Sequence, residues 1–214
     1  MNDNLSYVLY GHPRSGNAYK TALMLSMTGT PYEFRAVDLM DRSNLQPEYL
    51  AINPLGKVPV LHHGDLVLRQ SHDTLRYLAE QTGKFGTDSW MEEARVGDWI
   101  GFAVDFLGYG LARLRFELLF GAGPGPVFDY FKVTADRGLG IIEPHLATHE
   151  WLACGRPTIA DISVFPVMSF LADAGYDAAD FPNVAAWKER FQALPGFAWQ
   201  LELMPIENWP PSDA

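Results

Sequence analysis

The pattern of hydrophobic positions changes character about one third of the way along the chain. Residues 5–10 are apolar with no polar face, which predicts a strand that is covered on both sides. Ala18, Ala22 and Leu25 then share one stripe of a helix. A second strand is predicted over residues 32–39. Strands that are joined through a helix pair in parallel, so this segment predicts a parallel strand-helix-strand unit.

The same part of the chain continues with a short helix, a hairpin and a closing helix. The short helix is predicted over residues 47–52, because proline suits a first helical turn. Residues 58–61 and 66–68 are apolar runs on either side of a turn that contains glycine, which is typical of a hairpin. Residues 71–80 predict the last helix. The order of elements therefore predicts one mixed four-stranded sheet with helices on its faces.

The rest of the chain shows only helical patterns. Ser89 followed by Glu92 has the spacing of a capping box and predicts the start of a long helix. Thr158 and Asp161 have the same spacing and predict a second helix start. Helical stripes continue to about residue 201 and are interrupted by a cluster of glycine and proline at 121–126. We therefore predict an all-helical second part.

Length and composition narrow the class of protein. The chain has 214 residues, enough for two small domains, which we place at residues 1–82 and 89–214. A net charge of −10 without a basic stripe argues against nucleic acid as a partner. We find no apolar stretch long enough to span a membrane and no signal-segment pattern. The single cysteine, Cys154, excludes an internal disulfide. These features predict a cytoplasmic protein that does not bind membranes.

Residues 53–61, Asn-Pro-Leu-Gly-Lys-Val-Pro-Val-Leu, are the most informative stretch. Pro59 opens a buried strand, where a proline cannot donate to the sheet and a cis bond is often held in place. A cis bond after Val58 would leave the amide and carbonyl of Val58 free to pair with the main chain of a small peptide. The alternative is an ordinary turn before a strand.

Two further segments carry polar groups that suit the same ligand site. Gln70 and Ser71 begin a helix, and the free amides of a helix start attract a carboxylate. The alternative is that Ser71 only caps its helix. The turn after the first strand contains Arg14, Ser15 and Asn17, which taken singly are turn and cap residues. In a sheet of this order, both segments and the Val-Pro stretch meet at one end.

Together these stretches resemble the glutathione transferase superfamily, whose members have a thioredoxin-like first domain and an all-helical second domain. The stretches that carry the resemblance are residues 53–61, the pair Gln70 and Ser71, residues 75–78, 157–162 and 181–184, Trp187, Arg190, and residues 194–197. The resemblance implies that Val58, beside Pro59, pairs with the cysteinyl main chain of glutathione. It also implies that Gln70 and Ser71 hold the γ-glutamyl end, and that Lys57 reaches the glycine carboxylate. Arg14 is a further candidate for binding glutathione.

Members of this superfamily differ in the residue that activates the sulfur. Ser15 falls where bacterial cysteine-type members carry their cysteine, and Ser15-Gly16-Asn17 resembles the Thr-Pro-Asn of another bacterial group. Tyr10 falls where tyrosine-type members carry their tyrosine. We expect Ser15 to activate the sulfur with help from Asn17 and the helix start, with Tyr10 as the alternative. Lowering a thiol pKa of about 8.5 by about two units requires roughly 3 kcal/mol, which one charged hydrogen bond and a helix start together supply.

The substrate that accepts the sulfur is predicted only by class. Phe102, Phe106 and Tyr109 follow helical spacing and line either the core, a dimer contact or a pocket for an apolar substrate. His145 and His149 have a spacing that suits a metal, but a solvated helix face is the expected interpretation, so we predict no metal.

The resemblance also implies an activity and an assembly. It implies a cytoplasmic homodimer that conjugates glutathione to an electrophilic small molecule, as in detoxification. Two alternatives stay open: a glutathione-dependent disulfide or peroxide reductase, and a non-catalytic partner protein of the same fold.

Overall fold

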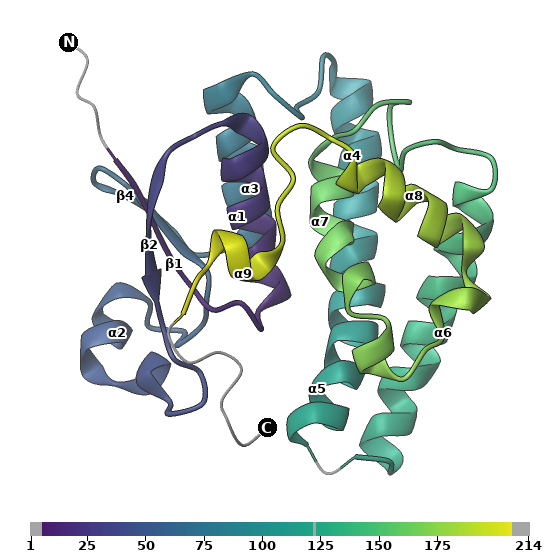
Figure 1. Cartoon of the computed structure of the whole chain (residues 1–214), viewed down its shortest axis with the longest axis horizontal. Helices are drawn as coiled ribbons and strands as arrows, with labels where there is room; N and C mark the ends of the chain where they lie inside the picture. The colour runs from purple at the N-terminus through teal and green to yellow at the C-terminus, as the bar shows by residue number, and fades with distance from the viewer. Residues whose placement is uncertain (1–5, 122, 207–214) are drawn as a thin grey trace. The chain divides into compact units, whose positions relative to one another are not determined.

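The computed structural model describes residues 6–121 and 123–206, which form two compact units. The first unit contains the described residues up to 82 and also residues 195–206, and the second contains residues 83–194. Figure 1 colours both units by position along the chain. The first residue of the first predicted strand, Leu5, and the last eight residues of the predicted second domain lie outside the described residues.

The sequence places residues 195–206 in the helical domain, whereas the structure places them with the first unit. Hydrogen bonds between distant residues explain the difference. The Tyr19 hydroxyl donates to the carbonyl oxygen of Ala198 at 3.0 Å. The Tyr32 hydroxyl donates to the carbonyl oxygen of Leu203 at 2.7 Å. These partners are more than 170 residues apart in sequence, so no local pattern indicates them.

The first unit is built on a mixed four-stranded sheet, as the sequence predicts. Its strands are β1 (Tyr7–Gly11), β2 (Tyr32–Ala36), β3 (Val60–His63) and β4 (Leu66–Leu68). Their order in the sheet is β2-β1-β3-β4. β1 and β2 are parallel, while β3 runs antiparallel to both β1 and β4. This is the thioredoxin-like arrangement implied by the resemblance.

Helices cover both faces of this sheet, with α1 and α3 on one face and α2 on the other (Figure 1). They are α1 (Gly16–Thr28), η1 (Ser43–Leu45), α2 (Pro47–Ile52), α3 (Ser71–Thr82) and α9 (Gln200–Leu203). α1 ends as predicted at Gly29, which adopts a left-handed conformation with φ of 72° that glycine accommodates without steric cost. Leu9, Leu61 and Val60 are all buried. Val60 packs in the cluster that contains Tyr49 of α2.

The described part of the second unit is entirely helical, as predicted. Its elements are α4 (Trp90–Phe102), the π-helical segment η2 (Ala103–Leu111), α5 (Ala112–Phe120), α6 (Pro126–Leu146), α7 (Ile159–Ser169), η3 (Ala172–Ala174), η4 (Ala178–Asp180) and α8 (Pro182–Gln192). η2 and α6 approach each other so closely at Gly110 that a Cβ atom there would lie 2.7 Å from the backbone nitrogen of Ala135. The core is formed around α7, where Phe165 stacks on Phe191 at 4.3 Å.

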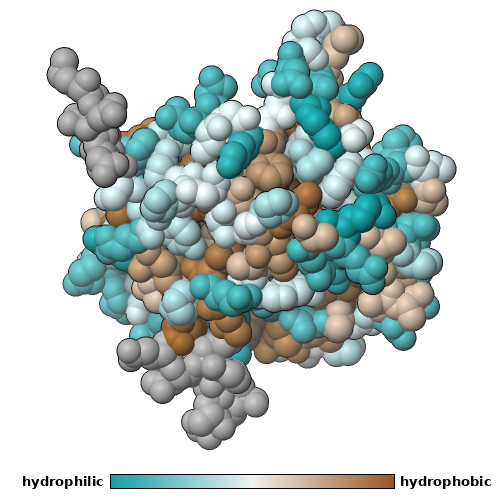
Figure 2. Space-filling model, turned by 45° about the horizontal axis from the view of Figure 1, so that its top comes forward, coloured by the Kyte–Doolittle hydropathy of each residue, from teal (hydrophilic) through white to brown (hydrophobic). Residues whose placement is uncertain are grey.

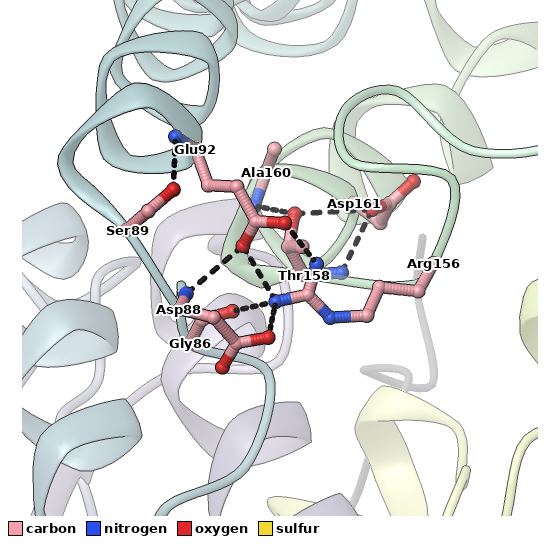
Figure 3. Close-up of polar contacts among 8 residues, drawn as sticks. All are labelled: Gly86, Asp88, Ser89, Glu92, Arg156, Thr158, Ala160 and Asp161. Carbon is pink, nitrogen blue, oxygen red and sulfur yellow. Dashed lines mark hydrogen bonds and ion pairs between the residues drawn. The ribbon is translucent and has the colours of Figure 1, made fainter.

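The predicted capping box of α7 is present. The Thr158 side chain accepts a hydrogen bond from the backbone of α7, and the Asp161 carboxylate accepts one from the Thr158 amide at 2.9 Å (Figure 3). Asp161 also accepts bonds from the Leu152 amide and the Trp187 indole, both at 3.1 Å. A buried carboxylate with this many donors fixes the start of α7 against α8 and the preceding loop.

The predicted capping box of α4 is only half formed. The Ser89 hydroxyl accepts from the Glu92 amide at 3.3 Å, but the Glu92 carboxylate accepts from the Asp88 amide and not from Ser89. Arg156 explains this difference, because its guanidinium donates to Glu92 at 2.7 Å and to Asp88 at 2.9 Å (Figure 3). The arginine therefore joins the start of α4 to the loop before α7.

Apolar and hydrophilic side chains are interspersed on the face that Figure 2 shows. The exposed apolar residues of the second unit include Val104, Tyr130 and Val133, with exposed fractions of 47%, 60% and 61%. Within the described ranges, no helix combines the length and the apolar character needed to cross a membrane.

Candidate functional site

The register of the sheet brings three predicted segments to one end of the first unit. Tyr10 pairs with Val60, so the end of β1 lies beside the start of β3. Leu61 pairs with Leu68, so the end of β4 lies at the same end of the sheet. The loop after β1, the Val58–Pro59 segment before β3 and the start of α3 therefore gather there (Figure 1).

The Val58–Pro59 peptide bond is cis. Neither the amide nor the carbonyl of Val58 has a main-chain partner among the described residues. The carbonyl before it, that of Lys57, accepts two hydrogen bonds, from the Tyr49 hydroxyl at 2.8 Å and from Asn53 Nδ2 at 2.7 Å. The main chain is thus firmly held on one side of Val58 and unpaired at Val58 itself.

Ser15 is the N-cap of α1. Its Oγ accepts a hydrogen bond from the Ala18 amide at 3.2 Å, so its own hydroxyl hydrogen is available to donate elsewhere. The turn before it is fixed by His12, whose carbonyl accepts from the Ser15 amide and whose Nδ1 accepts from the Arg14 amide. Burial lowers the pKa of His12, which keeps the ring neutral and able to accept.

The structure brings Asn17 and Ser71 together. The Ser71 hydroxyl donates to Asn17 Oδ1 at 3.4 Å, which links the first turn of α1 to the first residue of α3. Gln70, which precedes Ser71, and Lys57, which precedes Val58, are both exposed, so their side chains are accessible to a ligand. Ser15, Asn17 and Ser71 thus lie on neighbouring helix starts at one end of the sheet.

Tyr10 lies on the other face of the sheet. Its ring packs in the cluster that contains Val60 and Tyr49 of α2, with the Tyr49 ring 6.3 Å away. Its hydroxyl accepts a hydrogen bond from Arg35 of β2 at 2.9 Å. The structure therefore separates Tyr10 from Ser15, although the sequence leaves both as candidates.

Two titratable groups near the starts of α1 and α3, one buried and one partly buried, were not predicted. Lys20 is only 2% exposed, and its Nζ lies 3.3 Å from Nε2 of His72. Burial lowers the pKa of Lys20 to about 7, and burial together with Lys20 lowers that of His72 to about 3. Lys20 is one helical turn from Asn17, and His72 follows Ser71. The signal in the sequence was Lys20 itself, a charged residue among the apolar residues of α1.

The aromatic candidates of the second unit fall into two groups. Phe102 lies between Trp99 and Phe106, with ring distances of 5.0 Å and 5.3 Å. Tyr109, which is 51% exposed, contacts Tyr130 and Phe131 of α6 at 6.3 Å and 5.6 Å. Among the described residues, ring contacts therefore join Phe102 to Phe106, and join Tyr109 to α6.

His145 and His149 stack with their rings 4.1 Å apart and 5° from parallel. Their ring nitrogens do not converge on one point in this geometry, so the pair is not arranged for chelation. Over residues 6–121 and 123–206, no group of three or more histidine, cysteine or acidic side chains is placed to hold a metal ion.

Comparisons with known proteins agree with this architecture. The family model "Glutathione S-transferase, N-terminal domain" matches residues 5–80, and "Glutathione S-transferase, C-terminal domain" matches residues 96–195. Glutathione S-transferase 3 of Zea mays is 31% identical over an alignment 218 residues long, gaps included, which covers 96% of this chain and 98% of the maize protein. The chain belongs to the glutathione S-transferase family. Another relative of this transferase-family chain is the Disulfide-bond oxidoreductase YfcG of Escherichia coli, 29% identical over 84% of this chain and 87% of that protein.

Solved structures of bacterial glutathione S-transferases have the same fold. A glutathione S-transferase from Pseudomonas fluorescens Pf-5 superimposes with a TM-score of 0.83 at 30% identity, covering 91% of this chain and 98% of that one. A glutathione transferase family member from the same organism, crystallised with two glutathione bound, gives a TM-score of 0.80 at 25% identity, covering 92% of both chains.

Proposed function

We propose that this family member is a glutathione transferase that binds glutathione at the end of the sheet where α1 and α3 begin. The observation that carries the proposal is the unpaired main chain of Val58 beside cis Pro59. An amide and a carbonyl on one residue can pair with the main chain of an extended peptide, as an added strand pairs with a sheet edge. The glutathione-bound structural neighbour supports the same ligand.

In this proposal each end of glutathione meets a complementary group. Val58 pairs with the cysteinyl residue. Gln70 and Ser71 hold the γ-glutamyl carboxylate at the start of α3, where free amides and the helix dipole favour a negative charge. The cationic side chains of Lys57 and Arg14 supply positive charge for the glycine carboxylate.

Ser15 then stabilises the sulfur as a thiolate. Its Oγ already accepts from the Ala18 amide, so its hydrogen can donate to the sulfur, and Asn17 lies in the first turn of the same helix. Binding releases the thiol proton to solvent. The thiolate attacks an electrophilic carbon of an apolar substrate, a carbon-sulfur bond forms, and the leaving group departs with its electron pair.

A reductase function is the second candidate, because the relative YfcG is named a disulfide-bond oxidoreductase. Here the same thiolate attacks a disulfide, forms a mixed disulfide with one sulfur and releases the other as a thiol. A second glutathione thiolate then attacks the glutathione sulfur of the mixed disulfide, which forms glutathione disulfide and releases the remaining substrate sulfur as a thiol. Both reactions need the same activated sulfur, so they differ only in the second substrate.

The remaining expectations belong to this proposal. We expect the protein to act in the cytoplasm as a homodimer. The exposed apolar side chains of Val104 and Val133 support an association through the helical unit. Light scattering of the purified protein tests this expectation, because a mass of two chains supports the homodimer and a mass of one chain contradicts it.

The test combines binding with turnover. The purified protein is passed over immobilised glutathione, eluted with free glutathione, and assayed with a generic aromatic electrophile and with a glutathionyl mixed disulfide. Retention with conjugation supports the transferase, and retention with disulfide reduction alone supports the reductase. Retention without either turnover indicates a non-catalytic member, and absence of retention contradicts the glutathione site.

A further inference from the structure

The peptide group between Lys57 and Val58 links a well-held carbonyl to an unpaired amide. Val58–Pro59 is the cis bond found in the described chain, so the peptide between Lys57 and Val58 is trans. In a planar trans peptide, the C=O and N–H bonds point in opposite directions. Whatever fixes the direction of the Lys57 carbonyl therefore also fixes the direction of the Val58 amide.

Two side chains hold that carbonyl, one from Tyr49 within α2 and one from Asn53, the C-cap of α2. The Tyr49 hydroxyl and Asn53 Nδ2 both donate to it, at 2.8 Å and 2.7 Å. Both residues are buried, with exposed fractions of 6% and 0%. Asn53 is itself anchored, because its Oδ1 accepts from the Leu55 amide and its backbone amide donates to the carbonyl of Tyr49. The two donors thus occupy the carbonyl from positions that cannot easily move.

We propose that Tyr49 and Asn53 are positioning residues for glutathione, which hold the Lys57 carbonyl and thereby aim the Val58 amide at the ligand. This inference rests on the proposed glutathione site. Neither side chain touches glutathione in this arrangement, since both bind the carbonyl side of the peptide, opposite the amide that meets the ligand. Their contribution is preorganisation: the amide does not need to be oriented when the ligand binds, so less conformational entropy is lost.

The protonation state of Tyr49 agrees with its role as a donor. Burial and the neighbouring Tyr10 raise the pKa of Tyr49 to about 12, so its phenol keeps its hydrogen across the physiological range. The hydroxyl therefore donates to the Lys57 carbonyl at every pH at which the enzyme would be assayed.

The effect of losing this bond should appear in binding and not in chemistry. Tyr49→Phe removes the hydroxyl and retains the ring that packs against Tyr10. We expect the Kd and KM for glutathione to rise about threefold to tenfold, as for the loss of one ordinary hydrogen bond. The kcat at saturating glutathione and the pH profile should stay within about twofold of the wild type, because Ser15 and the helix starts are unchanged.

Tyr32→Phe is the matched control. It removes a tyrosine hydroxyl that donates to a main-chain carbonyl, that of Leu203, at 2.7 Å in the same unit. The control has no link to the Lys57 peptide, so it should bind glutathione as the wild type does. Equal losses in Tyr49→Phe and Tyr32→Phe would overturn the proposal, as would wild-type binding by Tyr49→Phe.

A second measurement on the ligand-free protein separates this inference from the proposed function. In a nitrogen-15 amide spectrum, Tyr49→Phe should shift the Val58 resonance, and Tyr32→Phe should leave it in place. An unmoved Val58 resonance in Tyr49→Phe overturns the positioning role, whether or not the protein binds glutathione. A shifted resonance in a protein that does not bind glutathione supports the holding of the peptide and contradicts only the proposed ligand.

Discussion

Removing the Ser15 hydroxyl should weaken the activation of the sulfur far more than it weakens the fold. The hydroxyl has two partners in the proposed complex: it accepts from the Ala18 amide at 3.2 Å and donates to the glutathione sulfur. Ser15→Ala removes both bonds. The first loss concerns the stability of α1, and the second concerns the charge on the sulfur, so the two can be measured separately.

The size of each loss follows from the type of bond. A hydrogen bond to a charged acceptor contributes roughly 1.5–3 kcal/mol, and one pKa unit corresponds to about 1.4 kcal/mol, so the pKa of the bound thiol should rise by about one to two units. At a pH below that pKa, kcat/KM should fall about 10- to 100-fold, in proportion to the thiolate fraction. Loss of an N-cap costs about 1 kcal/mol, which lowers the Tm of a chain of this size by about 2–4 °C.

The assay is the pH dependence of kcat/KM together with the ultraviolet absorbance of the bound thiolate. Ser89→Ala is the matched control, because Ser89 caps α4 in the other unit by the same type of bond, to the Glu92 amide at 3.3 Å. We expect it to lower the Tm by a similar amount and to leave the pH profile unchanged. Ser15→Thr retains a hydroxyl and a cap and should retain most of the activity.

Two results would refute this assignment. One is a loss of activity in Ser15→Ala no larger than that in Ser89→Ala, since the serine would then matter only to the helix. The other is an alkaline shift of the pH profile in Tyr10→Phe with none in Ser15→Ala, which would transfer the role to Tyr10 despite its position on the α2 face.

The other predictions concern buried charges and are tested by urea unfolding. The pKa of Lys20 falls from 10.5 to about 7 on folding, so the unfolded state binds more protons between these values and the wild-type stability should rise with pH across that window. Lys20→Met should abolish this rise. The substitution removes the unfavourable burial of the amine but also its contact with His72 at 3.3 Å, so the net effect at pH 7 should be a stabilisation of about 1–3 kcal/mol. A variant that is less stable at pH 7 would show that the lysine is favourable where it lies. Asp161→Asn should destabilise the helical unit by about 2–4 kcal/mol, because an amide nitrogen would face the donors of Leu152, Thr158 or Trp187. Asp177→Asn, at an exposed cap that accepts from the Ala179 amide at 2.9 Å, is its control and should change stability by about 0.5 kcal/mol or less.

Local signals in the sequence were enough to predict most elements of the first unit. The helix over residues 47–52 lies where its proline places it, and α1 ends at Gly29 because the left-handed cap favours glycine. The second strand ends at Ala36 and not at residue 39, because the Asp38 side chain accepts from the Met40 amide at 2.7 Å and turns the chain.

The site needed information that local patterns do not contain. Residues 10 and 15 are both near the end of the first strand, and only the packing of α1 and α2 on opposite faces shows that Tyr10 points away from Ser15. The contact between Lys20 and His72 joins residues 52 positions apart on two helices. In the same way, the donors to the Lys57 carbonyl are selected by the fold of the loop around Asn53, and residue types alone do not reveal them.

The most direct test of the proposed glutathione site is a crystal structure of this protein with glutathione bound. We predict that the cysteinyl main chain pairs with the amide and carbonyl of Val58, and that the sulfur lies within hydrogen-bond distance of the Ser15 hydroxyl. A glutathione bound elsewhere, or one whose sulfur lies beside Tyr10, would contradict it.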